Sequence, residues 1–231
     1  MSRNLLPLPL ALPALLALLA LLLAAPPATP GIPATPARGA QPARPGDDEL
    51  DPAPAEARRL AAGEVLVTAR RGAGGAAEQV ARGVVDAPPE RVFRAVTDFA
   101  HYQEFMPFVR RSAAEPQPDG SVVSFQALDL PLPLGSRHYK IHAFVEREQE
   151  PRPLWRTHWS YIPGSGNVAD HHGSWTLVEF GRGQTLGVCR LATDAGGGIP
   201  AWATNRGTAQ TLPYIFSGLR QQIHRSRYDL R

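Results

Sequence analysis

The chain has 231 residues, enough for one domain with a full core, and a formal net charge of +3. Three of its 24 basic residues precede Asp47, and the other 21 equal the 21 acidic residues that follow. This balance excludes the positive surface that binds a phosphate backbone, so we expect no nucleic-acid partner. Cys189 is the only cysteine, which excludes an intramolecular disulfide and a cysteine-based structural zinc site. We expect its thiol to be buried and inert.

The first 25 residues have the pattern of an export signal. Arg3 precedes an uncharged run of Leu, Ala and Pro that extends from Leu5 to Ala25. The run barely reaches the length of a membrane-spanning helix, and its early prolines weaken a straight helix. No clean cleavage site follows, so a cleaved signal peptide and a retained membrane anchor both remain open. We expect a periplasmic or extracellular protein, or one anchored by this segment.

Residues 26–62 are predicted to form a disordered linker. The segment is rich in Pro, Ala and Gly, and it has too little apolar surface to offset the chain entropy of folding. We therefore expect a single folded domain that covers residues 63–231.

This domain is predicted to begin with a hairpin and two short helices. Residues 65–70 and 79–85 alternate as strands on either side of a glycine-containing turn. Asp86 can cap a helix that has the prolines 88–89 in its first turn. Residues 102–106 indicate a second short helix.

An antiparallel meander and one long helix follow. Alternation predicts strands at 121–128, 139–146, 154–161, 174–180 and 185–193. A helix is expected from Pro200, with Pro213 as a kink in its interior. Its apolar stripe is Leu212, Ile215, Phe216, Leu219 and Ile223.

Two segments resemble the START-like superfamily. Residues 85–93 (VDAPPERVF) and 97–107 (TDFAHYQEFMP) are similar to its first helical segment. Residues 194–205 (DAGGGIPAWATN), with the helix that ends near Leu219, resemble its START lipid-transfer subgroup. The resemblance covers residues 63–228 and extends to polyketide cyclase-like and coenzyme Q-binding relatives. It implies an α+β helix-grip fold, in which a curved antiparallel sheet wraps a long C-terminal helix, and a tunnel for a lipid or similar molecule.

Eight residues are predicted to contact such a ligand: Phe125, Tyr139, Trp159, Tyr161, Trp175, Arg190, Trp202 and Asn205. Trp159 and Tyr161 share one strand face with Trp155 and Thr157, and aromatic side chains on a concave face can line a pocket. The alternative is that these aromatics only fill the core. Arg190 either faces water or meets an anionic headgroup.

The last two residues of this set, Trp202 and Asn205, lie at the start of the terminal helix. For both, a structural role is the alternative: helix docking for Trp202 and a backbone hydrogen bond for Asn205.

No catalytic or metal-binding set is predicted, and we expect no cofactor. His171 and His172 point to opposite faces of a strand, which does not suit one metal ion. The leading hypothesis is a monomeric, non-catalytic carrier of a hydrophobic molecule or lipid, with contact to a membrane surface. One alternative is a cyclase or aromatase that uses Tyr139, His158 or Arg190 as acid or base. The other is a membrane-tethered interaction module.

Overall fold

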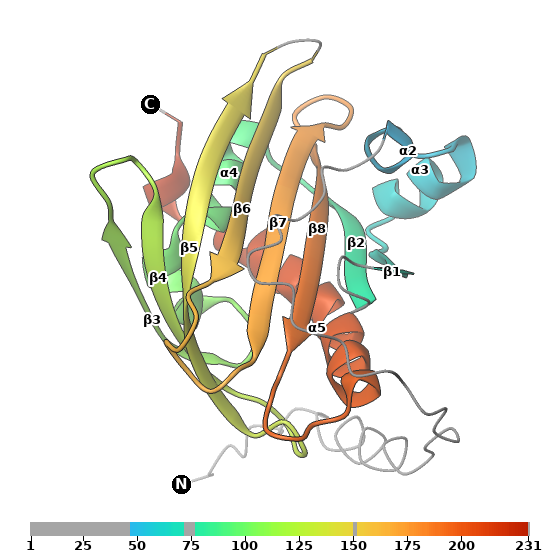
Figure 1. Cartoon of the computed structure of the whole chain (residues 1–231). Coiled ribbons are helices and arrows are strands. Elements are labelled where there is room, and N and C mark those ends of the chain that lie inside the picture. The colour runs from blue at the N-terminus through green and yellow to red at the C-terminus, as the bar shows by residue number, and fades with distance from the viewer. Residues whose placement is uncertain (1–46, 72–76, 150–151, 231) are drawn as a thin grey trace, which may run out of the picture. The chain divides into compact units, whose positions relative to one another are not determined.

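The structure, a computed structural model, describes residues 47–71, 77–149 and 152–230 (Figure 1). The chain divides into two units, Met1–Pro33 and Ala34–Arg231, and all of the described residues lie in the second. The apolar run at 5–25 and most of the predicted linker fall outside them. Within the described part, no helix is long and apolar enough to cross a membrane.

Eight antiparallel strands of the described chain form one curved sheet in the order β1-β2-β8-β7-β6-β5-β4-β3 (Figure 1). They are β1 (Leu66–Arg71), β2 (Ala77–Val85), β3 (Val109–Pro116), β4 (Val122–Asp129), β5 (Ser136–Glu148), β6 (Leu154–Tyr161), β7 (Asp170–Glu179) and β8 (Thr185–Asp194). The sequence pattern did not delimit β3, where exposed and buried residues do not alternate strictly. The other strands lie where alternation predicted them.

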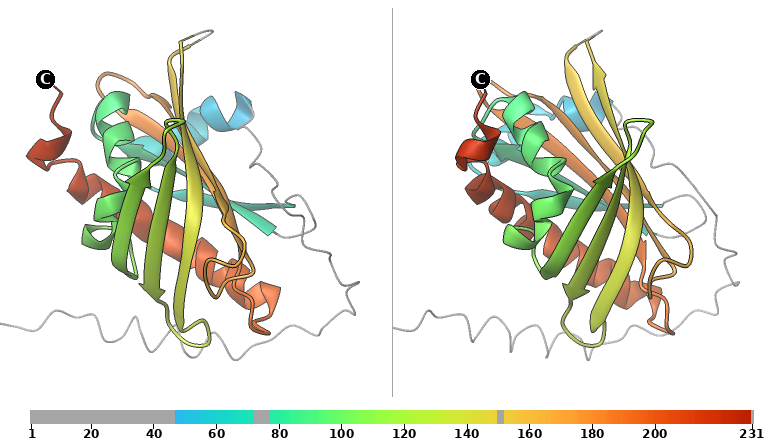
Figure 2. Two further views of the ribbon diagram at one scale, coloured as in Figure 1. Left: turned by 60° about the vertical axis from the view of Figure 1, so that its left-hand side comes forward. Right: turned by 90° about the vertical axis from the view of Figure 1, so that its left-hand side faces the viewer.

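The helices that position the site lie on the concave side of the sheet. α5 (Ala201–Gln222) crosses that side, with α4 (Pro89–Val96) and η2 (Phe99–Glu104) near its C-terminal half (Figure 2). This is the α+β helix-grip fold that the resemblance implied. Asp86 does not cap α4, because the helix begins at Pro89 with Pro88 as its N-cap and no side-chain cap bond.

Cross-strand pairing assigns the strand residues to faces. Tyr139 pairs with Gln126, Trp159 with Ala143, and Trp175 with both Thr157 and Cys189. Tyr139, Trp159, Trp175 and Cys189 all belong to the core cluster that includes Leu212 and Phe216 of α5. The aromatic face of β6 and β7 is therefore the concave face, a point that alternation alone left open.

Two facing glycines let α5 approach the sheet closely. Gly83 of β2 pairs with Gly187 of β8, and the fully buried ring of Phe216 lies over both. A Cβ on Gly83 would lie 2.6 Å from Cδ1 of that ring. The ring also makes an edge contact with Trp175, with centroids 5.1 Å apart. The C-terminal half of α5 is thus tightly packed on the sheet.

The convex face carries a second, smaller core under two helices that precede the sheet. α2 (Asp47–Leu50) and α3 (Pro54–Ala61) bury Leu50 and Leu60 against residues of β1, β2, β7 and β8. The linker prediction is therefore wrong for residues 47–62, and the folded part begins before Gly63. The segment is poor in apolar residues, but Leu60 loses all of its exposure.

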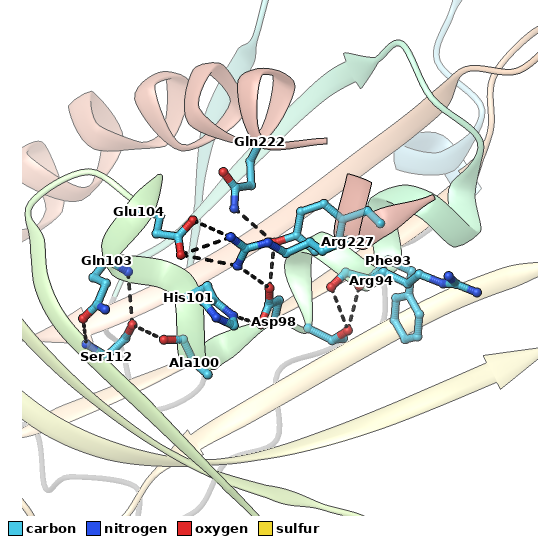
Figure 3. Close-up of polar contacts among 12 residues, drawn as sticks. Phe93, Arg94, Asp98, Ala100, His101, Gln103, Glu104, Ser112, Gln222 and Arg227 are labelled. Carbon is cyan, nitrogen blue, oxygen red and sulfur yellow. Dashed lines mark hydrogen bonds and ion pairs between the residues drawn. The ribbon is translucent and has the colours of Figure 1, made fainter. Parts of the chain in front are cut away.

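A polar network, here called the C-terminal latch, fastens the end of the chain to η2 (Figure 3). The hydroxyl of Tyr228 donates to Asp98 Oδ2 at 2.7 Å and accepts from Gln222 Nε2 at 3.1 Å. Arg227 pairs with Glu104 at 2.9 Å. His101 Nδ1 lies 2.6 Å from the other oxygen of Asp98. The latch ties the last turn of α5 to η2.

Candidate functional site

The structure brings four of the predicted residues together on the concave face: Tyr139, Trp159, Tyr161 and Trp175. Tyr139, Trp159 and Trp175 are buried, and Tyr161 is partly buried. Trp175 packs against Phe216, so it forms part of the sheet surface that contacts α5. The ring of Trp159 lies next to Gly173 of β7, where a Cβ would be 2.5 Å from its Cζ2 atom.

Phe125 and Arg190 lie on the opposite face, which corrects their assignment to the site. Phe125 pairs with Lys140, which is the residue next to the inward-facing Tyr139 on β5. Its ring lies 5.9 Å from the guanidinium of Arg111. In a strand, a shift of one residue moves a side chain to the other face of the sheet. Neither residue therefore faces α5.

Arg190 holds the convex-face helices instead of a ligand. Its guanidinium pairs with Glu49 of α2 at 2.5 Å and with Glu78 of β2 at 2.8 Å. The side chains of Arg190 and Glu49 are both only 3% exposed. Arg190 is thus neither solvated nor on the concave face, and its charge is compensated by carboxylates.

The N-terminal half of α5 carries a stripe of threonines. Thr204, Thr208, Thr211 and Ile215 lie on one stripe of the helix. Thr204 is buried, and the stripe is flanked by Gly207, where a Cβ would lie 3.0 Å from Leu134. Trp202 lies off this stripe and is 39% exposed.

Asn205 is partly buried beside the same stripe. Trp202 therefore belongs to the surface of the helix, and Asn205 lies next to the site.

His171 joins the concave aromatic residues, a place that the sequence pattern did not predict for it. Its ring lies 4.5 Å from that of Tyr139 and 6.3 Å from that of Trp159. Nδ1 of His171 is 3.0 Å from Oγ1 of Thr193. Burial lowers the pKa of His171 to about 3, so the imidazole is neutral near pH 7. His171 lies four residues before Trp175 on the same strand, so strand alternation places both side chains on the same face.

Buried polar atoms on the inner side of the domain lack protein partners. They are Ser124 Oγ, Thr157 Oγ1, Trp159 Nε1 and Thr204 Oγ1, here called the inner polar set. The first three face α5 from β4 and β6, and the fourth lies on α5 itself. Buried polar groups without partners are uncommon, so each of these atoms is a place where a water or another molecule can supply the bond.

The buried Tyr, His and Cys side chains on this face are neutral donors and acceptors. Burial raises the pKa of the Tyr139 phenol, whose hydroxyl donates to Gln126 Oε1 at 3.2 Å. Burial also raises the pKa of the Cys189 thiol, so it is not a thiolate nucleophile. Among the described residues, no group of three or more His, Cys, Asp or Glu side chains could hold a metal ion.

Similar solved structures share this fold. A STAR-related lipid transfer protein from Xanthomonas axonopodis is 20% identical, with a TM-score of 0.61 over 70% of this chain and 94% of that chain. Human StAR-related lipid transfer protein 5 is 15% identical, with a TM-score of 0.61 over 70% and 82% of the two chains.

A START superfamily protein from Mycobacterium smegmatis is 15% identical, with a TM-score of 0.53 over 63% of this chain and 96% of that chain. A search of curated protein sequences finds no match.

The sequence itself matches a family model. The model described as polyketide cyclase / dehydrase and lipid transport matches residues 85–211, which is more than half of the chain. The matched residues run from the end of β2 to the middle of α5, so they include the concave strands and the threonine stripe. The chain therefore belongs to the polyketide cyclase / dehydrase and lipid transport family, and it has a START-like helix-grip fold.

Proposed function

We propose that this protein binds a hydrophobic small molecule between the concave face of the sheet and α5, and carries it without chemical change. The observation that carries the proposal is the inner polar set, whose buried donors and acceptors lack partners beside aromatic side chains. An apolar surface with a few unsatisfied polar groups is the usual composition of a small-molecule site. The family, which includes lipid transport, supports the same reading.

The titratable groups on this face favour a carrier over an enzyme. A general base works best when its pKa is near the working pH, whereas that of His171 is lowered to about 3. The phenol of Tyr139 is held neutral by burial. His158 and Arg190, the other candidates for acid or base, lie on the convex side of the sheet, because His158 pairs with Phe144 and Arg190 with Ser174.

A cyclase or dehydratase is the second candidate, since the family includes such enzymes. The specific observation for it is the contact between Tyr139 and His171, which places a hydroxyl donor and a neutral imidazole on one buried face. These groups can orient an oxygen-bearing substrate by hydrogen bonds. The two candidates differ in outcome: a carrier releases the molecule unchanged, and an enzyme releases a product.

The proposal is tested by native mass spectrometry of the whole chain, followed by organic extraction. We expect an added mass that disappears on extraction and that is recovered as one apolar compound. The purified protein is then incubated with that compound, and the compound is extracted again. An unchanged mass supports a carrier, and a new product supports the enzyme. No retained molecule, together with no binding of apolar fluorescent probes, would contradict both.

We further propose that the ligand enters and leaves the site beside the N-terminal half of α5, and that this end of the domain contacts a membrane surface. Leu132, in the loop between β4 and β5, is 76% exposed, and Trp202 at the start of α5 is 39% exposed. Their two segments meet where Leu134 approaches Gly207. Replacing Leu132 by Ser should slow probe uptake from vesicles and leave the equilibrium affinity unchanged. Equal uptake rates would contradict the membrane contact.

The proposed place of action is outside the cytoplasm. The support is the uncharged run from Leu5 to Ala25 after a single basic residue. Alkaline phosphatase fused after residue 46 should be active, because it folds only where disulfides form. An inactive fusion would contradict export. Release of the fusion into the soluble fraction distinguishes a cleaved signal from an anchor, and retention in the membrane would favour the tethered interaction module.

A further inference from the structure

Arg137 places a positive charge on the concave face. It pairs with Leu128 between β5 and β4, two residues along from the inward-facing pair of Tyr139 and Gln126. Arg137 therefore faces the same side as Tyr139. It follows the loop that carries Leu134, which approaches Gly207 of α5. The guanidinium thus lies at the end of the site next to the N-terminal half of the helix.

No carboxylate of the described residues pairs with Arg137. Its Nη1 donates to the carbonyl of Ser136 at 2.9 Å, and its buried Nε has no acceptor. The residue is partly buried. The nearby carboxylate of Asp129 is engaged by Arg110 and by the hydroxyl of Ser136. A partly buried guanidinium without an anion is costly, so this arrangement favours an anion from outside the chain.

The other concave side chains that titrate do not compete for that anion. Burial keeps Tyr139 and Cys189 protonated and neutral, and it keeps His171 unprotonated and neutral near pH 7. Arg147 also faces this side, because it pairs with Trp155, but its charge is compensated by Glu90 at 3.1 Å. Arg137 therefore decides the charge of the molecule that this face accepts. By contrast, the buried Arg190 on the convex face has two carboxylate partners of its own.

We propose that Arg137 binds the anionic end group, a carboxylate or a phosphate ester, of an amphipathic ligand whose apolar body lies over the concave aromatic residues. The inference rests on the proposed function. A guanidinium suits this task because its planar donors match the oxygens of a carboxylate or phosphate. Arg137 then sets the specificity of the site for acidic amphiphiles over neutral ones of the same shape.

The test compares two fluorescent probes that differ only in charge, cis-parinaric acid and its methyl ester. We expect the whole chain to bind the acid roughly tenfold to a hundredfold more tightly than the ester, which is the range for a hydrogen bond to a charged group. Arg137→Gln should weaken binding of the acid to the level of the ester and leave the ester unchanged. Arg137→Lys should keep part of the preference.

Lys140→Gln is the matched control. It removes one positive charge from the same strand, but Lys140 pairs with Phe125 on the convex face and is exposed. This variant should keep the full preference for the acid. Loss of the preference in Lys140→Gln as well would assign the effect to net charge and overturn the role of Arg137.

The outcomes separate this inference from the proposed function. Equal affinity of the acid and the ester, or an equal loss of both in Arg137→Gln, overturns the role of Arg137 while ligand binding stands. If neither probe binds to the folded protein, the proposed function fails and this inference with it. Displacement of the acid by lauric acid and dodecyl phosphate identifies the favoured anion. Equal displacement by dodecanol would overturn the requirement for an anion.

Discussion

Replacement of Gly83 by alanine tests how closely α5 must lie on the sheet. The new Cβ would be 2.6 Å from Cδ1 and 2.7 Å from Cε1 of Phe216. Carbon atoms pack best at about 3.5–4.0 Å, so the ring would have to move by about 1 Å. Phe216 is fully buried and touches Trp175, so it cannot move without the helix. Overpacking of this kind costs about 1–3 kcal/mol.

The expected result is a lower free energy of unfolding, measured by urea denaturation followed through tryptophan fluorescence. For a domain of this size the melting temperature should fall by about 2–12 °C. Gly187→Ala is the graded control, because its Cβ would lie 3.2 Å from Trp175 and 3.3 Å from the same Phe216 ring. We expect a smaller loss there. An equal or larger loss for Gly187→Ala, or an unchanged Gly83→Ala protein, would refute the close-packing argument.

Three further changes probe the convex face, the buried histidine and the site. Arg190→Ala should lower the free energy of unfolding by about 3–5 kcal/mol, because it takes the guanidinium away from the buried carboxylates of Glu78 and Glu49, and Glu49 keeps only its pair with Arg70. Probe affinity should stay unchanged. Below pH 6.5 the unfolded chain binds a proton at His171 that the folded protein does not bind until about pH 3. The free energy of unfolding should therefore fall, by up to about 1.4 kcal/mol per pH unit, as the pH is lowered from 6.5 to about 3. Melting curves of His171→Gln should lose part of this dependence, and an identical acid profile would contradict it. Trp159→Ala should weaken probe binding by about 1–3 kcal/mol in a titration, whereas no change would remove Trp159 from the site.

Much of the fold can be predicted from local patterns, because strand alternation, turn residues and the apolar stripe of the last helix can each be recognised within a short segment of the sequence. The faces of β6 could be separated in this way, with Trp159 and Tyr161 on one side. Alternation does not say which side faces α5, since that depends on how the whole sheet curves. Phe125 and Arg190 were misassigned for this reason.

The convex-face helices were missed for a different physical reason. Residues 47–61 have the composition of a linker, and α2 and α3 are held by a few side chains that find partners far along the chain. Glu49 pairs with Arg190, and Glu56 pairs with Arg82. Ion pairs between residues so distant in sequence leave no periodic signal. His171 was missed likewise, because its contacts with Tyr139 of β5 and Thr193 of β8 join different strands of the sheet.

The two halves of α5 are built for different tasks, and Pro213 separates them. The C-terminal half buries Phe216 over two glycines and ends in the C-terminal latch, where Tyr228 and Gln222 join Asp98. The N-terminal half presents threonines and follows Gly196, Gly197 and Gly198, which all have positive φ angles.

Alanine at these three glycines would strain the backbone as well as stiffen it, so such variants cannot test mobility alone. Displacing the N-terminal half exposes polar groups that water can satisfy, whereas displacing the other half exposes a packed aromatic core. Opening therefore costs less at the end where Arg137 and Leu132 lie, which is where we place ligand exchange.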